Sequence, residues 1–176
     1  MNHVSGLSEL IRLCQQNNRR AQEKLYVTYA PKLFAVCLRY MPSREEAEEV
    51  LNGSFVKIFD RLSSFKGQGS FEGWMRQITV RTCLDTLRLK RINWELEPDD
   101  YALESKGAST RGDTHNSEHL LHLVQGLPTG YKTVFNLYAI EGFTHPEIAQ
   151  LCGISVGTSK SQLSKARKML QSALKE

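Results

Sequence analysis

The sequence lacks the signatures of an enzyme, of a secreted protein and of a membrane protein. Its 176 residues contain no G-x-S-x-G, no phosphate-binding glycine loop and no convergent pair of acidic residues, which argues against the common catalytic sites. No apolar run approaches the ~20 residues that span a bilayer. No basic segment followed by an apolar one opens the chain, so we expect no secretory signal. We therefore expect a cytoplasmic protein that is not an enzyme, needs no cofactor and does not insert into membranes.

Cysteine is scarce, and its spacing excludes the usual cysteine-based frameworks. No C-x-x-C pair occurs, which argues against a redox motif or a zinc ribbon. Each cysteine lies within an apolar pattern of helical period, so all are predicted to be reduced core residues rather than disulfides. They are Cys14, Cys37, Cys83 and Cys152.

A histidine cluster is the only candidate metal site in the sequence. His115, His119 and His122 are spaced four and three residues apart, so the three imidazoles could share one helix face and bind zinc. No cysteine completes the set, and Glu118 is the one carboxylate between its members. We therefore expect no bound metal.

The sequence also lacks the alternating apolar pattern of β-strands, and nearly every periodic segment has helical spacing. This predicts an all-α fold. Ser43 and Glu46 form an S-x-x-E capping box at the start of one helix, and Pro31 is expected to break or kink another. The helices predicted before the middle of the chain cover about residues 7–14, 21–40, 44–62 and 71–91.

Residues 93–115 differ in character from the rest of the chain. They carry six acidic and two basic residues, a net charge of −4, and are interrupted by one proline and two glycines. Such a composition predicts a mostly disordered, flexible acidic linker. It would join two small helical domains, at residues 1–92 and 116–176.

The clearest motif is a helix-turn-helix at residues 144–166. Thr144 and Glu147 form a T-x-x-E capping box at the start of its first helix. Gly153 suits the positive φ that ends this helix, and Ser155 can cap the second. This arrangement is typical of DNA-binding proteins, in which the second helix enters the major groove. An ordinary helical hairpin with a glycine turn is the alternative.

Basic residues concentrate on two helices. The last helix contains four of them and no acid before Glu176, and the fourth predicted helix is also basic. Either helix alone would suggest a solvated surface, but two on separate domains predict two contacts with one polyanion. In the last helix, Thr158 and Ser161 suit phosphate hydrogen bonds, whereas Ser159 and Gln162 could reach base edges. Its predicted core stripe is Leu163, Ala166, Leu170 and Leu174.

Three segments resemble the extracytoplasmic-function (ECF) sigma factors, the compact class of bacterial RNA polymerase specificity subunits. Residues 47–65, AEEVLNGSFVKIFDRLSSF, resemble the polymerase-binding helix of that family. Residues 71–91 resemble its promoter-melting, minus-ten-reading helix, and residues 126–170 resemble its region 4. The most specific match is GISVGT-x-KS-x-L-x-KAR-K-x-L. The resemblance covers about residues 20–92 and 117–174, and implies a subunit that joins core polymerase, recognises two promoter boxes and helps to open the duplex.

The resemblance also implies roles for individual residues. The loop at 63–70, including Phe65, would hold an extruded minus-ten base. Core RNA polymerase and promoter DNA are the implied partners, and an anti-sigma factor is a further candidate because many family members are held inactive by one. The implied polymerase-binding residues are Glu49, Asn52, Ser54 and Lys57. The residues implied to follow the melting strand are Arg76, Gln77, Arg81 and Arg88. Those implied at the minus-thirty-five element are Thr158, Ser159, Lys160, Ser161, Gln162 and Lys165.

The chain departs from the family pattern on both domains. Gly53 stands where the family usually has an acid, and glycine inside a helix costs about 1 kcal/mol relative to alanine. Core binding is therefore expected to be weaker or to use neighbouring residues. Ser159 and Gln162 replace the usual valine and arginine, and Arg81 replaces a common asparagine. Two alternatives stay open: a DNA-binding regulator that does not engage polymerase, and a degenerate sigma-like protein that sequesters a partner.

Overall fold

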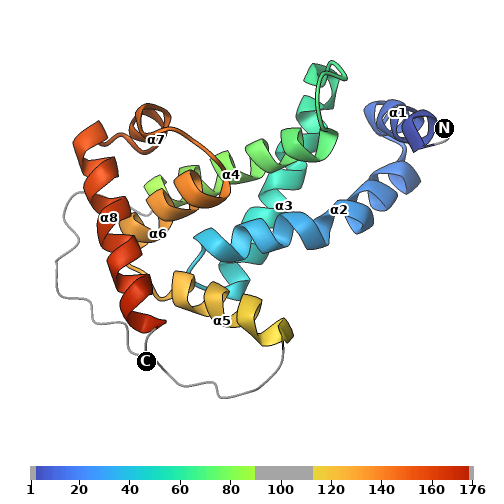
Figure 1. Ribbon diagram of the computed structural model, residues 1–176. Helices are drawn as coiled ribbons and strands as arrows, with labels where there is room; N and C mark the ends of the chain where they lie inside the picture. The colour runs from blue at the N-terminus through green and yellow to red at the C-terminus, as the bar shows by residue number, and fades with distance from the viewer. Residues whose placement is uncertain (1–2, 90–112, 175–176) are drawn as a thin grey trace. The chain divides into compact units, whose positions relative to one another are not determined.

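Every regular element in the described part of the chain is a helix (Figure 1). The computed structural model describes residues 3–89 and 113–174. The chain forms two compact units, Met1–Thr86 and Leu87–Glu176. The all-α prediction is confirmed. Most of the expected acidic linker lies outside the described residues, and its last three residues, 113–115, already belong to a helix.

The first unit is built on two long helices that pack along each other, α2 and α3 (Figure 1). α2 continues through Pro31, so the predicted break is wrong. Leu25 and Leu33, on either side of the proline, are both buried, and this shared packing holds the two halves in one helix despite the missing N–H. The elements of this unit are α1 (His3–Gln15), α2 (Arg19–Tyr40), α3 (Arg44–Arg61), the 3₁₀-helix η1 (Leu62–Ser64) and all but the last three residues of α4 (Phe71–Leu89).

Side-chain caps position the long helices, as the sequence predicts for α3. The Ser43 hydroxyl accepts the Glu46 N–H at 3.2 Å. Beside it, the pKa of Glu45 is lowered by its own backbone N–H and by the Ser43 hydroxyl. Carboxylates in a first helical turn also complement the helix dipole. The start of α3 is thus fixed by local hydrogen bonds.

The core of the first unit contains hydroxyl side chains that apolar periodicity alone does not predict. Ser54, Thr79 and Thr82 are buried, and each donates to the carbonyl four residues earlier in its helix. Such bonds satisfy a polar group without a partner from another helix. Two aromatic residues of this unit, Phe59 and Trp74, are only partly buried.

The second unit packs its last helix against the helices that precede it. Its elements are α5 (Asp113–Gln125), α6 (Thr129–Phe135), the π-helix η2 (Asn136–Ile140), α7 (His145–Cys152) and α8 (Val156–Ala173). Leu163, Ala166 and Leu170 of α8 are buried as predicted, whereas Leu174 is exposed because the helix ends before it. The central core cluster is Leu123, Val124, Leu127, Tyr131, Ala166 and Leu170.

Candidate nucleic-acid interface and polymerase-binding face

Local hydrogen bonds build the helix-turn-helix of α7 and α8 as the sequence predicts. The Glu147 carboxylate accepts the Thr144 N–H at 2.8 Å and the Thr144 hydroxyl at 2.7 Å, and both bonds lower the Glu147 pKa. Gly153 ends α7 with φ +71°. The Ser155 hydroxyl then accepts the Thr158 N–H at 2.9 Å and caps α8. The turn between the two helices is therefore fixed at both ends.

The outer face of α8 is cationic and contains no acidic side chain. Lys160, Ser161 and Lys165 are exposed, as expected for residues that meet DNA. The three- and four-residue spacing of a helix adds further exposed positions that were not predicted. These are Gly157, Ser164 and Lys168. Extending the helical period from Lys160 and Ser161 would have found them.

Two residues predicted to reach base edges instead lie in the interior. Ser159 is 0% exposed and Gln162 is 5% exposed. Ser159 lies four residues before Leu163, and Gln162 lies four residues before Ala166, so the helical period turns both toward the core. The prediction that they face solvent is wrong, and neither side chain reaches a base in this conformation.

The hydroxyls of Thr158 and Ser161 already have partners. The Thr158 hydroxyl lies 2.9 Å from the Ser155 hydroxyl. Ser161 donates to the Thr158 carbonyl at 3.0 Å. Ser161 would have to rotate its hydroxyl away from this carbonyl to donate to a phosphate. Either hydroxyl of the Thr158–Ser155 pair can be the donor, so Thr158 keeps its own proton available when Ser155 donates. The lysines are thus the groups of α8 best placed to bind an anion.

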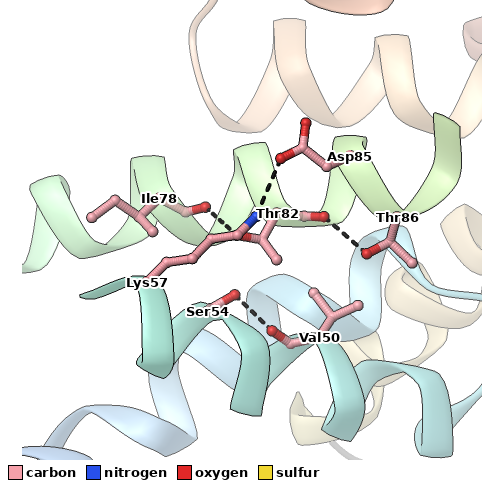
Figure 2. A network of polar contacts seen from close by, with 7 residues as sticks. All are labelled: Val50, Ser54, Lys57, Ile78, Thr82, Asp85 and Thr86. Atoms are coloured by element: carbon pink, nitrogen blue, oxygen red, sulfur yellow. Dashed lines mark hydrogen bonds and ion pairs between the residues drawn. The ribbon is translucent and has the colours of Figure 1, made fainter. Parts of the chain in front are cut away.

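On the first unit, α4 presents a polar row. Gln77, Arg81 and Arg88 are exposed, as predicted, and Arg76 is partly buried. Asp85 lies on the same helix and is also exposed. Its carboxylate forms an ion pair with Lys57 of α3 at 3.2 Å (Figure 2). Lys57 therefore reduces the negative charge on this face of α4.

The loop between η1 and α4 lies over an aromatic cluster. Phe65 is partly buried, with its ring centroid 5.0 Å from Phe71 and 5.5 Å from Trp74. Phe71 and Trp74 are stacked at 5.6 Å. Gly67 and Gly69 have positive φ angles of 72° and 82°, which suit a tight turn beside these rings. The cluster offers aromatic surface of the kind on which unstacked bases bind.

The predicted polymerase-binding residues divide into exposed and buried ones. Glu49 and Asn52 are exposed on α3. Ser54 is 0% exposed and donates to the Val50 carbonyl at 2.7 Å (Figure 2), so the expectation that it lies on the binding face is wrong. Lys57 is partly buried. Only Glu49 and Asn52 are thus presented as predicted.

A groove of about 360 Å³ lies between α2 and α3 beside Asn52. The Tyr26 hydroxyl donates to Asn52 Oδ1 at 3.2 Å at its edge. Val27, in its wall, is 66% exposed. Exposed apolar side chains next to a hollow are typical of protein-binding surfaces. The groove is lined by Tyr26, Val27, Ala30, Pro31, Phe34, Arg44, Glu48, Leu51 and Asn52.

Neither a metal cluster nor a membrane-spanning helix occurs among the described residues. Among them, no group of three histidine, cysteine or acidic side chains could hold a metal ion. His119 and His122 are exposed, whereas the side chain of His115 lies outside the description. Nor does any helix described here have both the length and the apolar character needed to cross a membrane.

The two units correspond to two families of domain. The family model described as Sigma-70 region 2 matches residues 25–92, and the one described as Sigma-70, region 4 matches residues 117–170. The chain is 27% identical to the ECF RNA polymerase sigma-E factor of Haemophilus influenzae, over 94% of this chain and 93% of that protein. It is 24% identical to the ECF RNA polymerase sigma factor SigW of Bacillus subtilis, over 97% of each.

Solved structures share the fold. CnrH in complex with the cytosolic domain of CnrY matches with a TM-score of 0.50 and 21% identity, over 94% of this chain and 95% of that one. The sigma factor RpoE in complex with the anti-sigma factor NepR, from Bartonella quintana, matches with a TM-score of 0.52 and 20% identity, over 87% and 96%. With two sigma-70 regions covering most of its length, the chain belongs to the ECF class of the sigma-70 family and is a sigma factor that directs promoter-specific transcription initiation.

Proposed function

We propose that the two units divide promoter recognition between them. The first unit, with α4 and the loop at 63–70, would read and melt the minus-ten element. The second, with α8, would read the minus-thirty-five element. The observation that carries this proposal is the acid-free, lysine-bearing outer face of α8 on a fully capped helix-turn-helix. The chain would act in the cytoplasm, without a catalytic step of its own.

On α8, the lysines would position the helix on the phosphates. Lys160 and Lys165, five residues apart, lie on opposite flanks of the exposed face, with Lys168 between them. They can therefore reach phosphates on the two sides of the major groove. Gly157 and Ser164 share the exposed face and allow a close approach to base edges. Because Ser159 and Gln162 are buried, we do not assign them base contacts.

On α4, the exposed row of Gln77, Arg81 and Arg88 would follow the separated strand. Phe65 and its aromatic neighbours would receive an unstacked base, an interaction worth about 1–3 kcal/mol per base. Asp85 would repel the strand if it were left unpaired, so its ion pair with Lys57 supports this role of α4.

On α2 and α3, Glu49, Asn52 and the neighbouring groove would form the polymerase-binding face. Lys57 would serve chiefly to neutralise Asp85. The structures similar in fold include sigma factors bound to CnrY and to the anti-sigma factor NepR. We infer that this chain also has an anti-sigma partner, which would compete with polymerase for the groove.

The central test combines core binding with transcription. We expect the purified chain to co-purify with core RNA polymerase and to drive specific initiation from a promoter selected from a random library by the reconstituted holoenzyme. Failure to bind core while still binding duplex DNA would favour a regulator that works without polymerase. Binding to core without any transcript would favour a degenerate sigma-like protein.

The α8 interface has its own test. Lys160→Ala should weaken promoter binding uniformly across sequences and reduce the slope of log affinity against log salt by about one. The matched control is Lys24→Ala, which removes an exposed lysine from α2 and should leave the slope unchanged. An unchanged slope in the Lys160 variant would remove this residue from the phosphate contacts.

A further inference from the structure

A histidine connects the two helices of the helix-turn-helix. His145 is the first residue of α7, and its Nδ1 lies 2.9 Å from the hydroxyl oxygen of Ser159 on α8. Its ring stacks on Tyr138 of η2, with centroids 4.6 Å apart and planes 25° from parallel. Arg167 of α8 lies over the same tyrosine ring, 5.6 Å from its centroid. One imidazole of α7 thus contacts both η2 and α8.

Two cationic side chains of α8 act on this imidazole, and one of them, Lys160, is expected to meet DNA. The His145 pKa is lowered first by burial and then by the positive charges of Lys160 and Arg167. Of the other elements packed here, η2 contributes only the Tyr138 phenol among titratable groups. On α7 itself, the Glu147 carboxylate is occupied by Thr144. No acidic side chain of α8 offsets the two cations, since that helix has none.

We propose that His145 is a positioning residue for the recognition helix, acting through Ser159, and that its imidazole takes up a proton when α8 binds DNA. This rests on the proposed contact between α8 and promoter DNA. A phosphate bound at Lys160 offsets one of the two charges that oppose protonation. The imidazolium keeps the existing geometry, because a protonated Nδ1 donates to the Ser159 hydroxyl oxygen.

Linkage fixes the sign of the effect. If the DNA-bound form holds its proton more tightly than the free form, affinity for DNA rises as the pH falls through the range below the usual imidazole pKa of about 6.5. A purely structural role gives the opposite sign. Burial disfavours the imidazolium, so acid would loosen α7 from α8 and weaken binding. The direction of the pH dependence therefore separates the two roles.

The test measures holoenzyme affinity for a fluorescent promoter duplex, selected from a random library, between about pH 5.5 and pH 8, on either side of the usual histidine pKa. For each chain we compare the affinity at about pH 5.5 with its own affinity at about pH 8. We expect this ratio to be about two- to fivefold larger for the wild-type chain than for His145→Gln, a size typical of coupling between partly exposed charges. His119→Gln, at an exposed histidine of α5, is the control and should keep the wild-type profile. Ser159→Ala should weaken binding at every pH.

Identical pH profiles for wild type and His145→Gln would overturn the proposal. So would an affinity for DNA that falls in acid for the wild type but not for His145→Gln. Failure of the wild-type holoenzyme to bind any selected duplex would instead overturn the underlying DNA contact. If the variants fold poorly, the proton uptake can still be tested on the wild-type chain by following the titration of His145 with and without DNA. The imidazole Cε1–H resonance of His145 should titrate at higher pH with duplex DNA than without it. An unchanged midpoint, while the α8 amide resonances shift, would refute the proton uptake.

Discussion

Gly53→Ala should stabilise the first unit. Gly53 lies inside α3, it has no positive φ, and a Cβ added there would meet no atom within 4 Å. Nothing in the structure therefore requires glycine at this position. Replacing it with alanine removes the backbone entropy that glycine loses on folding, without creating a clash or filling a cavity.

The expected gain follows from helix propensity alone. Alanine is favoured over glycine in a helix interior by about 0.8–1 kcal/mol, and the open surroundings of Gly53 add no packing term. For a unit of this size, about 1 kcal/mol corresponds to a rise in Tm of roughly 4–8 °C. Gly153→Ala is the matched control, because φ at that position is +71°. There an alanine costs about 1–2 kcal/mol, so the same substitution should have the opposite sign.

Thermal unfolding followed by far-ultraviolet circular dichroism would measure both variants. The reasoning is refuted if Gly53→Ala lowers Tm or leaves it unchanged, since a required role for glycine would then exist that the free space around it does not show. Gly53→Asp restores the acidic residue that the family usually has at this position, so comparing it with Gly53→Ala separates the effect of the charge from the effect of helix stability. If it binds core polymerase more tightly than Gly53→Ala does, the missing acid itself weakens core binding.

Three further predictions follow from contacts in the two units. Lys57→Met should slow promoter opening with little change in core binding, because it exposes the charge of Asp85, and adding Asp85→Asn should restore the opening rate; slow opening in the double variant would contradict this. Burial raises the pKa of the Cys152 thiol to about 12, so it should resist a thiol reagent at about pH 8 until the chain is unfolded, and rapid labelling of the native chain would show the burial to be wrong. Hydrogen bonds from Thr144 lower the Glu147 pKa, so the cap's stabilisation is present above the unfolded pKa of about 4.3 and is lost as the pH falls through the lower folded value. The difference in Tm between wild type and Glu147→Gln should therefore shrink in acid, and a constant difference would argue against the carboxylate as its source.

Most of the fold could be predicted because it is coded locally. Capping residues such as Ser43 and Thr144 determine where helices begin through bonds to backbone groups three residues away. Gly153 ends a helix because its φ is positive. The failures arise where tertiary packing overrides a local preference. Pro31 does not break α2, because buried residues on both sides hold the two halves together. The π-helix η2 has one more residue per hydrogen-bonded turn than an α-helix, and the spacing of apolar residues in the sequence does not reveal this.

The functional residues were harder to predict than the helices, because a polar side chain in the sequence is not necessarily exposed in the fold. Ser54 and Ser159 are polar, yet both are fully buried with hydrogen-bond partners of their own. The partner of Ser159 lies fourteen residues away on another helix, so spacing within α8 could not reveal it. The ion pair between Lys57 and Asp85 joins two helices in the same way. The exposure and the role of a charge or hydroxyl on one helix thus depend on its partners on a neighbouring helix.

Because Ser159 is buried, it can influence DNA sequence specificity only indirectly, through the placement of α8. A side chain that cannot reach a base can still determine which bases its neighbours reach, because it sets the rotation of α8 about its own axis. Ser159 lies next to Lys160, and its bond to His145 joins this turn of α8 to the start of α7. A change at either residue would turn the exposed lysines relative to the groove. The departure at position 159 is therefore better understood as a change in how the recognition helix is held than as a change in the bases it reads.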